Sequence, residues 1–367
     1  MTPPTPDATD ALRKARCFRL RALLGWSSVV YAVLLGVFLA VLELWSRPHW
    51  LWSGLLFLPP QLWLAPLLVL TPLCVLWHKP LCALHLAIAL GVGFGYMGFR
   101  WHRPLPARAP ALTVVTANVG QRDPRRLAAF LEQTQPDVVL YQDGRRPGLL
   151  PTANRAGFWS ARQREFVVAS RWPIRSSGLV GALRYDRQPV AAWFELDWNG
   201  RAVVLYNVHM PTPRRFLEKF RGEGYGLEAV RWRGLLSRAD RDANAAYWQE
   251  RKRLAEGLRE ALRRETRPMI VAGDFNMPDH GWLYRMFARE WTDAFAARGR
   301  GWGMTFPGRG GPVQQLIGPW LRLDYVLCDA HWRVLDCVVE PPQPAEHRAV
   351  MARLEFQGED AKTPGRD

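Results

Sequence analysis

The sequence is poor in cysteine and lacks a nucleotide-binding glycine motif. Its 367 residues include five cysteines, too few for a disulfide framework, and no Cys/His spacing of the kind that binds zinc. No G-x-G-x-x-G or P-loop pattern opens a predicted helix, and no internal repeat is visible. These absences argue against a disulfide-stapled module, a zinc finger and nucleotide-cofactor chemistry.

Two of the cysteines lie close together near the C-terminus. We expect Cys328 and Cys337 on neighbouring strands of a short hairpin that turns at Asp329–His331. In that register Cys328 lies near Trp332 and Cys337 near Leu323, so the two thiols should not face each other. A structural disulfide is therefore not predicted.

Acidic residues are few relative to basic ones. The chain has 33 Asp and Glu against 49 Lys and Arg, which gives a net charge of +16 and a pI near 10.3. Such a field favours anionic partners, such as nucleic acid, anionic lipid head groups or phosphorylated metabolites. A genome that uses Arg freely would produce the same composition, so charge alone does not name the substrate.

Long apolar runs are confined to the first hundred residues. Leu23–Trp45, Leu55–Trp77 and Leu81–Phe99 are candidates for crossing a hydrocarbon core of about 30 Å. The middle run contains several prolines, so we expect it to be kinked or re-entrant. Tryptophans cluster near the ends of the runs, as in interfacial belts: Trp45, Trp50, Trp52, Trp63, Trp77 and Trp101. A core hairpin of a soluble protein is the alternative, and three runs in succession argue against it.

Basic residues precede the first apolar run, namely Arg13, Lys14, Arg16, Arg19 and Arg21. This flank predicts a cytoplasmic N-terminus. Three crossings would then place the chain after Arg100 on the outer face of an inner or plasma membrane. If the proline-rich middle run does not cross, the same part of the chain returns to the cytoplasm. The first run is too long, and too poor in a small-residue cleavage site, to indicate a removed signal peptide.

The part of the chain that follows the apolar runs is predicted to form one large domain. We predict a cytoplasmic basic tail at 1–22, a transmembrane anchor of about three helices at 23–100, a linker at 101–111, a catalytic domain at 112–356 and a disordered tail at 357–367. Strands are expected at Leu112–Ala117, Val138–Tyr141, Phe166–Ala169, Ala191–Leu196, Ala202–Val208, Met269–Ala272, Leu323–Leu327 and Arg333–Val339, and helices at Arg125–Gln133 and Asn244–Arg264. Many strands with few helices favour a two-sheet α/β sandwich over a Rossmann sheet.

Polar side chains stand at the ends of these strands. They are Asn118, Asp143, His209, Asp274, Asn276, Asp324, Glu346 and His347, the last two closing the final strand. Strand ends that share one edge of a layered sheet converge on one cleft. A single Asn or Asp at a strand end is more often a turn former than a catalytic group. The succession of NVHMP, GDFN, RLDYVL and EHRAV at the ends of apolar strands nevertheless favours a catalytic site.

The chemistry of phosphoester hydrolysis explains why such a set would gather. It uses a hard cation held by carboxylate and amide oxygens, which neutralises the phosphate and the leaving oxygen. It also needs a base for water and an imidazole that stabilises charge on the phosphoryl oxygens. Asp143 and Glu346 suit the metal, Asp274 suits the base, and Asp324 with His347 suits a carboxylate–imidazole pair.

With these motifs, the sequence resembles the endonuclease/exonuclease/phosphatase superfamily over roughly Leu112–Glu355. GDFN is the most specific piece, supported by RLDYVL, the terminal acid–His pair and SRWPI. The resemblance implies a four-layer α/β sandwich, phosphoester hydrolysis and a Mg²⁺ or Mn²⁺ cofactor. It also implies that Asn118 helps to hold metal and phosphate, Asp143 binds the metal, Asp274 positions the nucleophilic water, Asn276 contacts the phosphate, Asp324 orients His347 and Glu346 lies at or near the metal.

Two acids depart from the pattern of this superfamily. It usually has Gln-Glu where the chain has Gln142-Asp143, and Ser-Asp-His where the chain has Ala345-Glu346-His347. Both exchanges keep the charge but move the oxygens by about an ångström, a displacement to which catalysis is sensitive. The imidazole of His209 fits the deoxyribonucleases and phosphatases of the superfamily rather than its abasic-site nucleases.

The segment Pro211–Asp242 interleaves basic and aromatic residues. The basic ones are Arg214, Arg215, Lys219, Arg221, Arg231, Arg233, Arg238 and Arg241, and the aromatic ones are Phe216, Phe220, Tyr225 and Trp232. Such a segment can hold strand phosphates and stacked bases, or lie on an anionic membrane surface. A solvated loop with a short amphipathic helix is the third interpretation.

Three functions stay open on the sequence alone. The first is a membrane-anchored, divalent-metal-dependent phosphodiesterase, either a nuclease or a hydrolase of phospholipid or sphingomyelin-type head groups. The second is a phosphomonoesterase acting on inositol or sugar phosphates. The third is a catalytically silent binding module in which the altered acids have lost metal affinity. The third is opposed by the retention of five residues of the site, namely Asp274, Asn276, His209, Asp324 and His347. No protein partner can be inferred from the sequence.

Overall fold

The computed structural model describes residues 6–45, 49–120, 127–145, 157–213, 238–308, 318–342 and 346–358. By internal packing the chain forms two compact units. One comprises Met1–Leu44 and Leu58–Gly98, and the other comprises Trp45–Phe57 and Phe99–Asp367. Most of the basic–aromatic segment, the start of the predicted helix Arg125–Gln133 and most of the predicted C-terminal tail fall outside the described residues.

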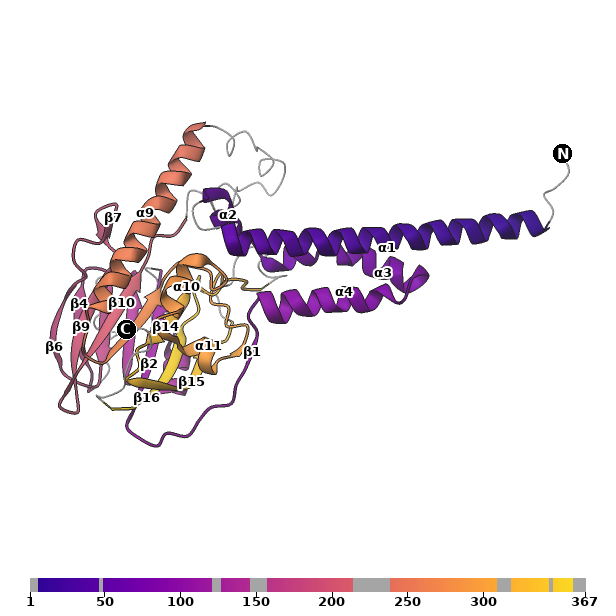
Figure 1. Ribbon diagram of the computed structural model, residues 1–367. Coiled ribbons are helices and arrows are strands. Elements are labelled where there is room, and N and C mark those ends of the chain that lie inside the picture. Colours follow the sequence, from indigo (N-terminus) through magenta and orange to yellow (C-terminus); the bar gives the residue numbers. More distant parts are fainter. Residues whose placement is uncertain are drawn as a thin grey trace. The chain divides into compact units, whose positions relative to one another are not determined.

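The first unit is helical. It contains α1 (Pro6–Trp45), the 3₁₀ turn η1 (Pro60–Leu64), α3 (Leu67–Trp77), α4 (Leu81–Leu90) and the π-helical turn η2 (Gly91–Tyr96) (Figure 1). By length and composition, Asp10–Leu44 and Pro60–Trp77 are able to cross a membrane, whereas the third apolar stretch is only Leu81–Tyr96. The predicted middle run is interrupted at its prolines, with Pro72 inside α3.

A short chain of polar contacts connects the long helices of this unit. The imidazole of His85 on α4 lies 3.0 Å from Ser28 Oγ on α1 and 3.1 Å from Thr71 Oγ1 on α3. Ser28 and His85 are buried. Polar side chains of this kind hold helices together in apolar surroundings.

The second unit is built on two six-stranded mixed sheets. The first has the order β12 (Thr292–Asp293), β14 (Asp324–Cys328), β11 (Met269–Asp274), β10 (Arg201–His209), β9 (Ala191–Trp198) and β6 (Ile174–Leu179). The second has the order β15 (Trp332–Val339), β16 (Val350–Phe356), β2 (Ala111–Asn118), β3 (Val138–Gln142), β5 (Phe166–Ser170) and β4 (Trp159–Gln163). β10 pairs with β11, and β2 with β3, in parallel; the other neighbours in these sheets are antiparallel. Two further pairs are small: β1 (Arg100–Trp101) with β13 (Arg300–Gly301), and β7 (Arg184–Tyr185) with β8 (Gln188–Pro189).

Side-chain alternation along the strands produces the layers of the sandwich. In β2, Leu112 and Val114 face the core between the sheets, whereas Val115 and Ala117 pack towards α5 (Ala128–Thr134). Helices α9 (Arg238–Arg263) and α10 (Trp282–Ala288) cover the other sheet, and the short α11 (Ala294–Arg298) packs near β14 and β15 (Figure 1). The predicted four-layer α/β sandwich is confirmed.

A segment of the predicted membrane anchor packs within this second unit. It contains α2 (Trp50–Leu55), which contacts α9. The Phe57 ring lies 6.1 Å from that of Trp248 on α9, and the Phe57 carbonyl accepts a hydrogen bond from Trp320 Nε1 at 3.1 Å. The His280 imidazole lies 3.0 Å from the Leu56 carbonyl oxygen. Leu56 and Phe57, which lie between the first two apolar helices, are thus buried within the sandwich unit.

Two local predictions were wrong. β14 and β15 do not form a hairpin, because at Asp329–His331 the chain crosses from one sheet to the other. A short link between two apolar strands is compatible with a hairpin and with a crossing between sheets, so the sequence alone did not distinguish them. Cys328 and Cys337 are both buried in the core between the sheets as free thiols, as expected, with Cys328 Sγ 3.9 Å from the Trp332 carbonyl oxygen.

The second correction concerns the last strand. It begins at Val350, so Glu346 and His347 precede this strand instead of closing it. Because β16 runs antiparallel to β2, its beginning lies at the edge where β2 ends. The two residues therefore reach the predicted edge from the opposite direction.

Candidate active site

Both sheets bring their polar strand ends to one edge. β2 and β3 end side by side, at Asn118 and just before Asp143. In the other sheet His209 pairs with Asp274 at the parallel ends of β10 and β11, and Asp324 at the start of antiparallel β14 pairs with Asp274. The structure therefore brings together the predicted residues of two sheets.

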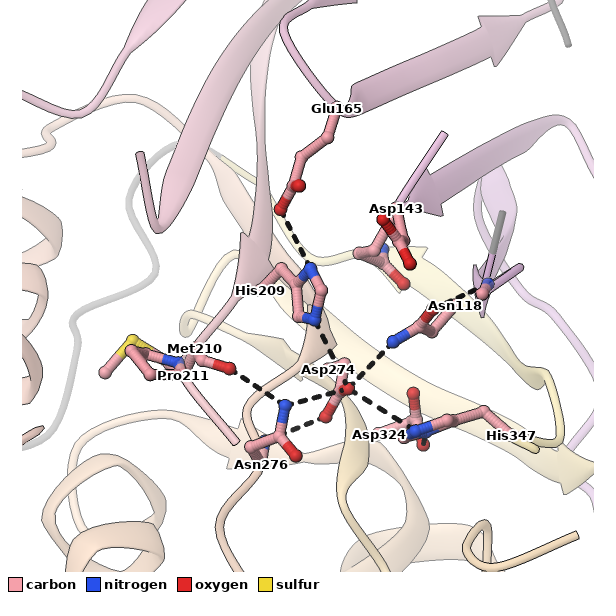
Figure 2. A network of polar contacts seen from close by, with 12 residues as sticks. Asn118, Asp143, Glu165, His209, Met210, Pro211, Asp274, Asn276, Asp324 and His347 are labelled. Carbon is pink, nitrogen blue, oxygen red and sulfur yellow. Dashed lines mark hydrogen bonds and ion pairs between the residues drawn. The ribbon is translucent and has the colours of Figure 1, made fainter. Parts of the chain in front are cut away.

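Asp274 is fully buried and lies at the centre of this group (Figure 2). Its Oδ2 accepts hydrogen bonds from Asn118 Nδ2 at 2.9 Å and Asn276 Nδ2 at 3.0 Å, and its Oδ1 accepts the Asn276 backbone N–H at 2.8 Å. The Nε2 atoms of His209 and His347 lie 3.8 and 3.7 Å from Oδ2. One carboxylate thus faces two amides and two imidazoles.

The end of β11, which carries Asp274, depends on the glycine before it. Gly273 has φ 147°, and a Cβ there would lie 2.0 Å from the Val208 carbonyl oxygen, so a larger residue does not fit. Asn276 adopts φ 49°, which asparagine tolerates, and donates from Nδ2 to the Met210 carbonyl at 2.8 Å. The ends of β10 and β11 are thereby held together.

Each imidazole is held at Nδ1 by its own carboxylate. His347 Nδ1 lies 2.9 Å from Asp324 Oδ2, and His209 Nδ1 lies 2.8 Å from Glu165 Oε1. Burial alone would lower the pKa of His347, but Asp324 and Asp274 outweigh it and raise the pKa to about 9. Burial is likewise outweighed at His209, whose pKa is raised by Glu165 and Asp274. Protonated imidazoles are suited to stabilise the charge of phosphoryl oxygens.

Glu165 was missed by the sequence prediction. It is buried, and its Oε2 accepts two hydrogen bonds from Arg145, from Nε at 2.9 Å and Nη2 at 2.6 Å. Burial would raise the pKa of Glu165, but hydrogen bonds from His209 and Arg145 lower it overall. Glu165 directly precedes β5, which is antiparallel to β3, so it lies at the edge where β3 ends. Glu165 could have been predicted by searching for polar residues just before a strand as well as just after one, because the start of an antiparallel strand lies at the same edge as the end of its neighbour.

A second polar bridge between the sheets lies beside the site. Gln142 is buried, and its Nε2 donates to Thr116 Oγ1 at 2.9 Å and to Asn207 Oδ1 at 2.7 Å. The Nδ2 of Asn207 returns a hydrogen bond to the Tyr141 carbonyl at 3.0 Å. Gln142 therefore holds the sheets in register next to Asp143.

Three predicted metal ligands gather around the end of β2. Asn118 Oδ1 accepts the Gly120 N–H at 3.0 Å, and a Cβ on Gly120 would lie 3.8 Å from Glu346 Oε2. Asp143 leaves β3 with φ 55° and lies near Asn118 (Figure 2). Its Oδ1 is 3.9 Å from Arg145 Nε. These side chains offer hard oxygen donors, which suit Mg²⁺ or Mn²⁺.

Asp274, Asp324 and His347 form another group close enough to share an ion, with their ligand atoms within 4.8 Å of one another. His347 Nδ1, however, is already hydrogen-bonded to Asp324. Its raised pKa favours the imidazolium, which has no lone pair for a metal. This group is therefore better suited to hydrogen bonding and proton transfer than to metal binding.

A cavity of about 840 Å³ opens beside His209. Its lining includes Tyr185 from the β7–β8 pair, Asn244 and Tyr247 from α9, and Pro211. Ligand sites usually measure roughly 300–1,000 Å³. A group attached to a phosphoryl centre near His209 therefore has room in this cavity.

The model of the endonuclease/exonuclease/phosphatase family matches residues 115–347. The chain belongs to this family. The match spans all the predicted site residues, from Asn118 to His347. As a family member the protein is a hydrolase of phosphoester bonds.

Several solved structures are similar to the family domain of this chain. The 3′ phosphatase NExo from Neisseria, bound to a product DNA hairpin, shares 17% identity over 67% of this chain and 100% of its own, with a TM-score of 0.45. A D. rerio TDP2 humanised by 14 mutations shares 14% identity over 67% and 99%, with a TM-score of 0.47. A family protein from Leptotrichia buccalis shares 14% over 67% and 100%, with a TM-score of 0.43. No curated protein sequence matches the chain.

Glu165→Gln is expected to lower kcat by about ten- to a hundredfold with little change in KM. The reason is the loss of a charge-assisted hydrogen bond to His209, which is worth about 1.5–3 kcal/mol. Steady-state kinetics on a chromogenic phosphodiester would measure it. Glu260→Gln, which affects an exposed ion pair with Arg264, serves as the control and should retain wild-type kcat. Equal kinetics for both variants would mean that Glu165 does not support His209.

Proposed function

We propose that the protein is a membrane-anchored, divalent-metal-dependent phosphodiesterase. The arrangement around Asp274 carries this proposal: a buried carboxylate faces two imidazoles, each with its own carboxylate, beside a set of oxygen donors. The cavity beside His209 gives room to one of the groups esterified to the phosphorus. Nucleic acid and phospholipid-type head groups are two phosphodiester substrate classes that fit the basic chain.

The oxygen donors Asn118, Asp143 and Glu346 would hold a Mg²⁺ or Mn²⁺ ion. Such an ion, when bound, supplies positive charge to the phosphoryl and leaving oxygens. Asp143 is one methylene shorter than the acid usual in the family, and Glu346 is one methylene longer. Because both lie near the end of β2, the two length changes are suited to compensate each other.

The other site residues handle the water and the phosphoryl charge. Asp274, held by Asn118 and Asn276, orients the attacking water and takes its proton. His209 and His347 donate hydrogen bonds to phosphoryl oxygens through Nε2, because their Nδ1 atoms are held by carboxylates. A silent binding module would need neither the buried base nor the paired imidazoles.

A hydrolysis screen of the full chain in detergent micelles tests this function. DNA, RNA, sphingomyelin, other phospholipids and inositol phosphates are incubated with Mg²⁺ or Mn²⁺, and the Asp274→Asn protein serves as the blank. We expect cleavage of a phosphodiester that the blank does not cleave. Cleavage of phosphomonoesters alone would support the second candidate function, and failure on all substrates would support a binding module.

We further propose that the catalytic unit lies on the outer face of the membrane. The apolar helices expose large side chains such as Leu23 on α1, Leu68 on α3 and Leu86 on α4, which water solvates poorly. Residues 49–57 and 99–358 belong to the same compact unit, so both must lie on the same side. The α3–α4 pair between them must then cross twice or dip and return. α1 alone sets the side, and its basic start favours a cytoplasmic N-terminus.

Reporter fusions after Phe57 and after Pro110 are expected to report the same, outer side. The reason is that the catalytic unit contains chain from both positions, so the intervening helices cannot change sides. A reporter active only outside the cytoplasm and one active only inside are fused at each position. Opposite sides for the two fusions would contradict the even number of crossings. Cytoplasmic signals at both positions would instead direct the substrate search to intracellular phosphoesters.

A further inference from the structure

Arg251 on α9 is a fully buried cation behind the active site. Its Nη1 donates to the Pro211 carbonyl at 2.6 Å, and its Nη2 donates to the Asn276 carbonyl at 2.6 Å. Pro211 follows His209 by two residues, and Asn276 follows Asp274 by two residues. One guanidinium group therefore joins the two segments that leave the catalytic strands β10 and β11.

The surroundings of Arg251 are not those of a structural ion pair. In the part of the chain that the structure describes, its guanidinium contacts carbonyl oxygens, the Tyr247 hydroxyl at 3.0 Å and two aromatic rings. Its Cζ lies 5.8 Å from the Tyr247 ring centroid and 5.2 Å from that of Trp248. Burying a cation without a carboxylate partner is costly, and an apolar residue would fill the same volume without that cost. The guanidinium must therefore have a role that an apolar side chain cannot fill.

The geometry of the two carbonyls indicates what that is. The two segments already contact each other, because Asn276 Nδ2 donates to the Met210 carbonyl and the Met210 N–H donates to the Asp274 carbonyl at 2.9 Å. These bonds fix the segments relative to each other but not relative to α9. Arg251 links both segments to α9, because its planar fork spans two acceptors at once. The Tyr247 hydroxyl of α9 also donates to the Pro211 carbonyl at 3.0 Å, but it reaches only that one segment.

We propose that Arg251 is a positioning residue for the hydrolytic site: it sets the placement of His209 and Asp274 by fixing the segments that follow them. Among the described residues its hydrogen bonds go to two carbonyl oxygens and the Tyr247 hydroxyl, and not to the proposed metal ligands. An error of about 1 Å in such placement can lower the rate about a hundredfold. The kinetic part of this inference rests on the proposed phosphodiesterase function, whereas the positioning itself can be observed without substrate.

The test compares Arg251→Lys with Arg253→Lys in the full-length protein. An ammonium group is a point charge and cannot span both carbonyls, so Arg251→Lys is expected to lower kcat by about ten- to a hundredfold at nearly constant KM. Arg253 lies two residues further on the same helix and forms an exposed ion pair with Glu250, so its variant should keep wild-type kcat. Bis(p-nitrophenyl) phosphate with Mn²⁺ is the probe.

Amide hydrogen exchange followed by mass spectrometry gives the second readout. Arg251→Lys should accelerate exchange together in the peptides that cover residues 206–213 and 270–278, and Arg253→Lys should not. Leu258→Ala, which opens a void under the same helix, controls for lost stability: it should lower the Tm and keep kcat. If both peptides of the Arg251→Lys protein exchanged at the wild-type rate, the proposal would be overturned. This holds even if neither the wild type nor any variant cleaved a substrate. A kcat loss in Leu258→Ala equal to that in Arg251→Lys would also overturn it.

Discussion

Asp274→Asn is expected to lower kcat by at least a hundredfold while the protein stays folded, which is the usual size of a general-base effect. The substitution keeps the shape of the side chain but replaces one carboxylate oxygen by an NH₂ group. That group cannot accept a proton, and one of the donors on Asn118 and Asn276 would face another donor. Initial rates on a phosphodiester measure the loss, and circular dichroism and thermal unfolding check the fold.

Asp329→Asn is the matched control for this variant. Asp329 is a buried acid beyond the far end of β11, where it accepts hydrogen bonds from the Met269 and His331 backbone N–H groups at 3.0 and 3.1 Å. Its substitution should cost stability but not turnover. Near-wild-type turnover in a folded Asp274→Asn protein would remove Asp274 from the mechanism.

Removal of divalent metal should abolish activity, and Mg²⁺ or Mn²⁺ should restore it. Asn118, Asp143 and Glu346 are hard donors, and the uncompensated charge on the phosphoryl group opposes attack when no cation is bound. Activity is measured after treatment with EDTA and during titration with each metal. Full activity in the chelator would refute metal dependence.

The assignment of the metal ligands has its own control in the two altered acids. Asp143→Glu and Glu346→Asp each restore the acid length that is usual in the family. If the two side-chain lengths compensate, each single variant should need a higher metal concentration for half-maximal activity than the wild type. The double variant should then need a lower metal concentration than the product of the two single effects predicts. Independent effects of the two exchanges would mean that the acids do not share one ion.

Much of the sandwich could be predicted from the sequence, because its strands are short, apolar and bounded by polar residues. The eight predicted strands are all present. Apolar runs such as Val203–Val204–Leu205 are fully buried, and such runs can be recognised without knowing which strands lie beside them. The positions of polar residues at the strand ends also predicted that they meet at one edge, and the structure brings them together there. Their catalytic and metal-binding roles stay predictions, since the geometry alone does not measure them.

What the sequence did not reveal depends on pairing direction and on distant contacts. β4 and β6 escaped prediction because their side chains are mostly half-exposed or exposed and leave no apolar signal. Glu165 escaped because its position becomes informative only when β5 is known to be antiparallel to β3. The packing of Phe57 against Trp248 is similarly invisible, because an apolar residue beside a membrane run looks like part of that run.

The position of β16 has a consequence for how the enzyme matures. This strand is the last one that the structure describes, yet it pairs with β2 on one side and β15 on the other, and His347 lies just before it. A nascent chain therefore has a gap inside one sheet until the ribosome has passed Phe356. Because long-range strand pairing is slow, this sheet is completed only after β16 has been synthesised and has paired with both neighbours. A chain that stops before Val350 therefore lacks the strand that joins β2 to β15, and one that stops before His347 also lacks an imidazole of the site.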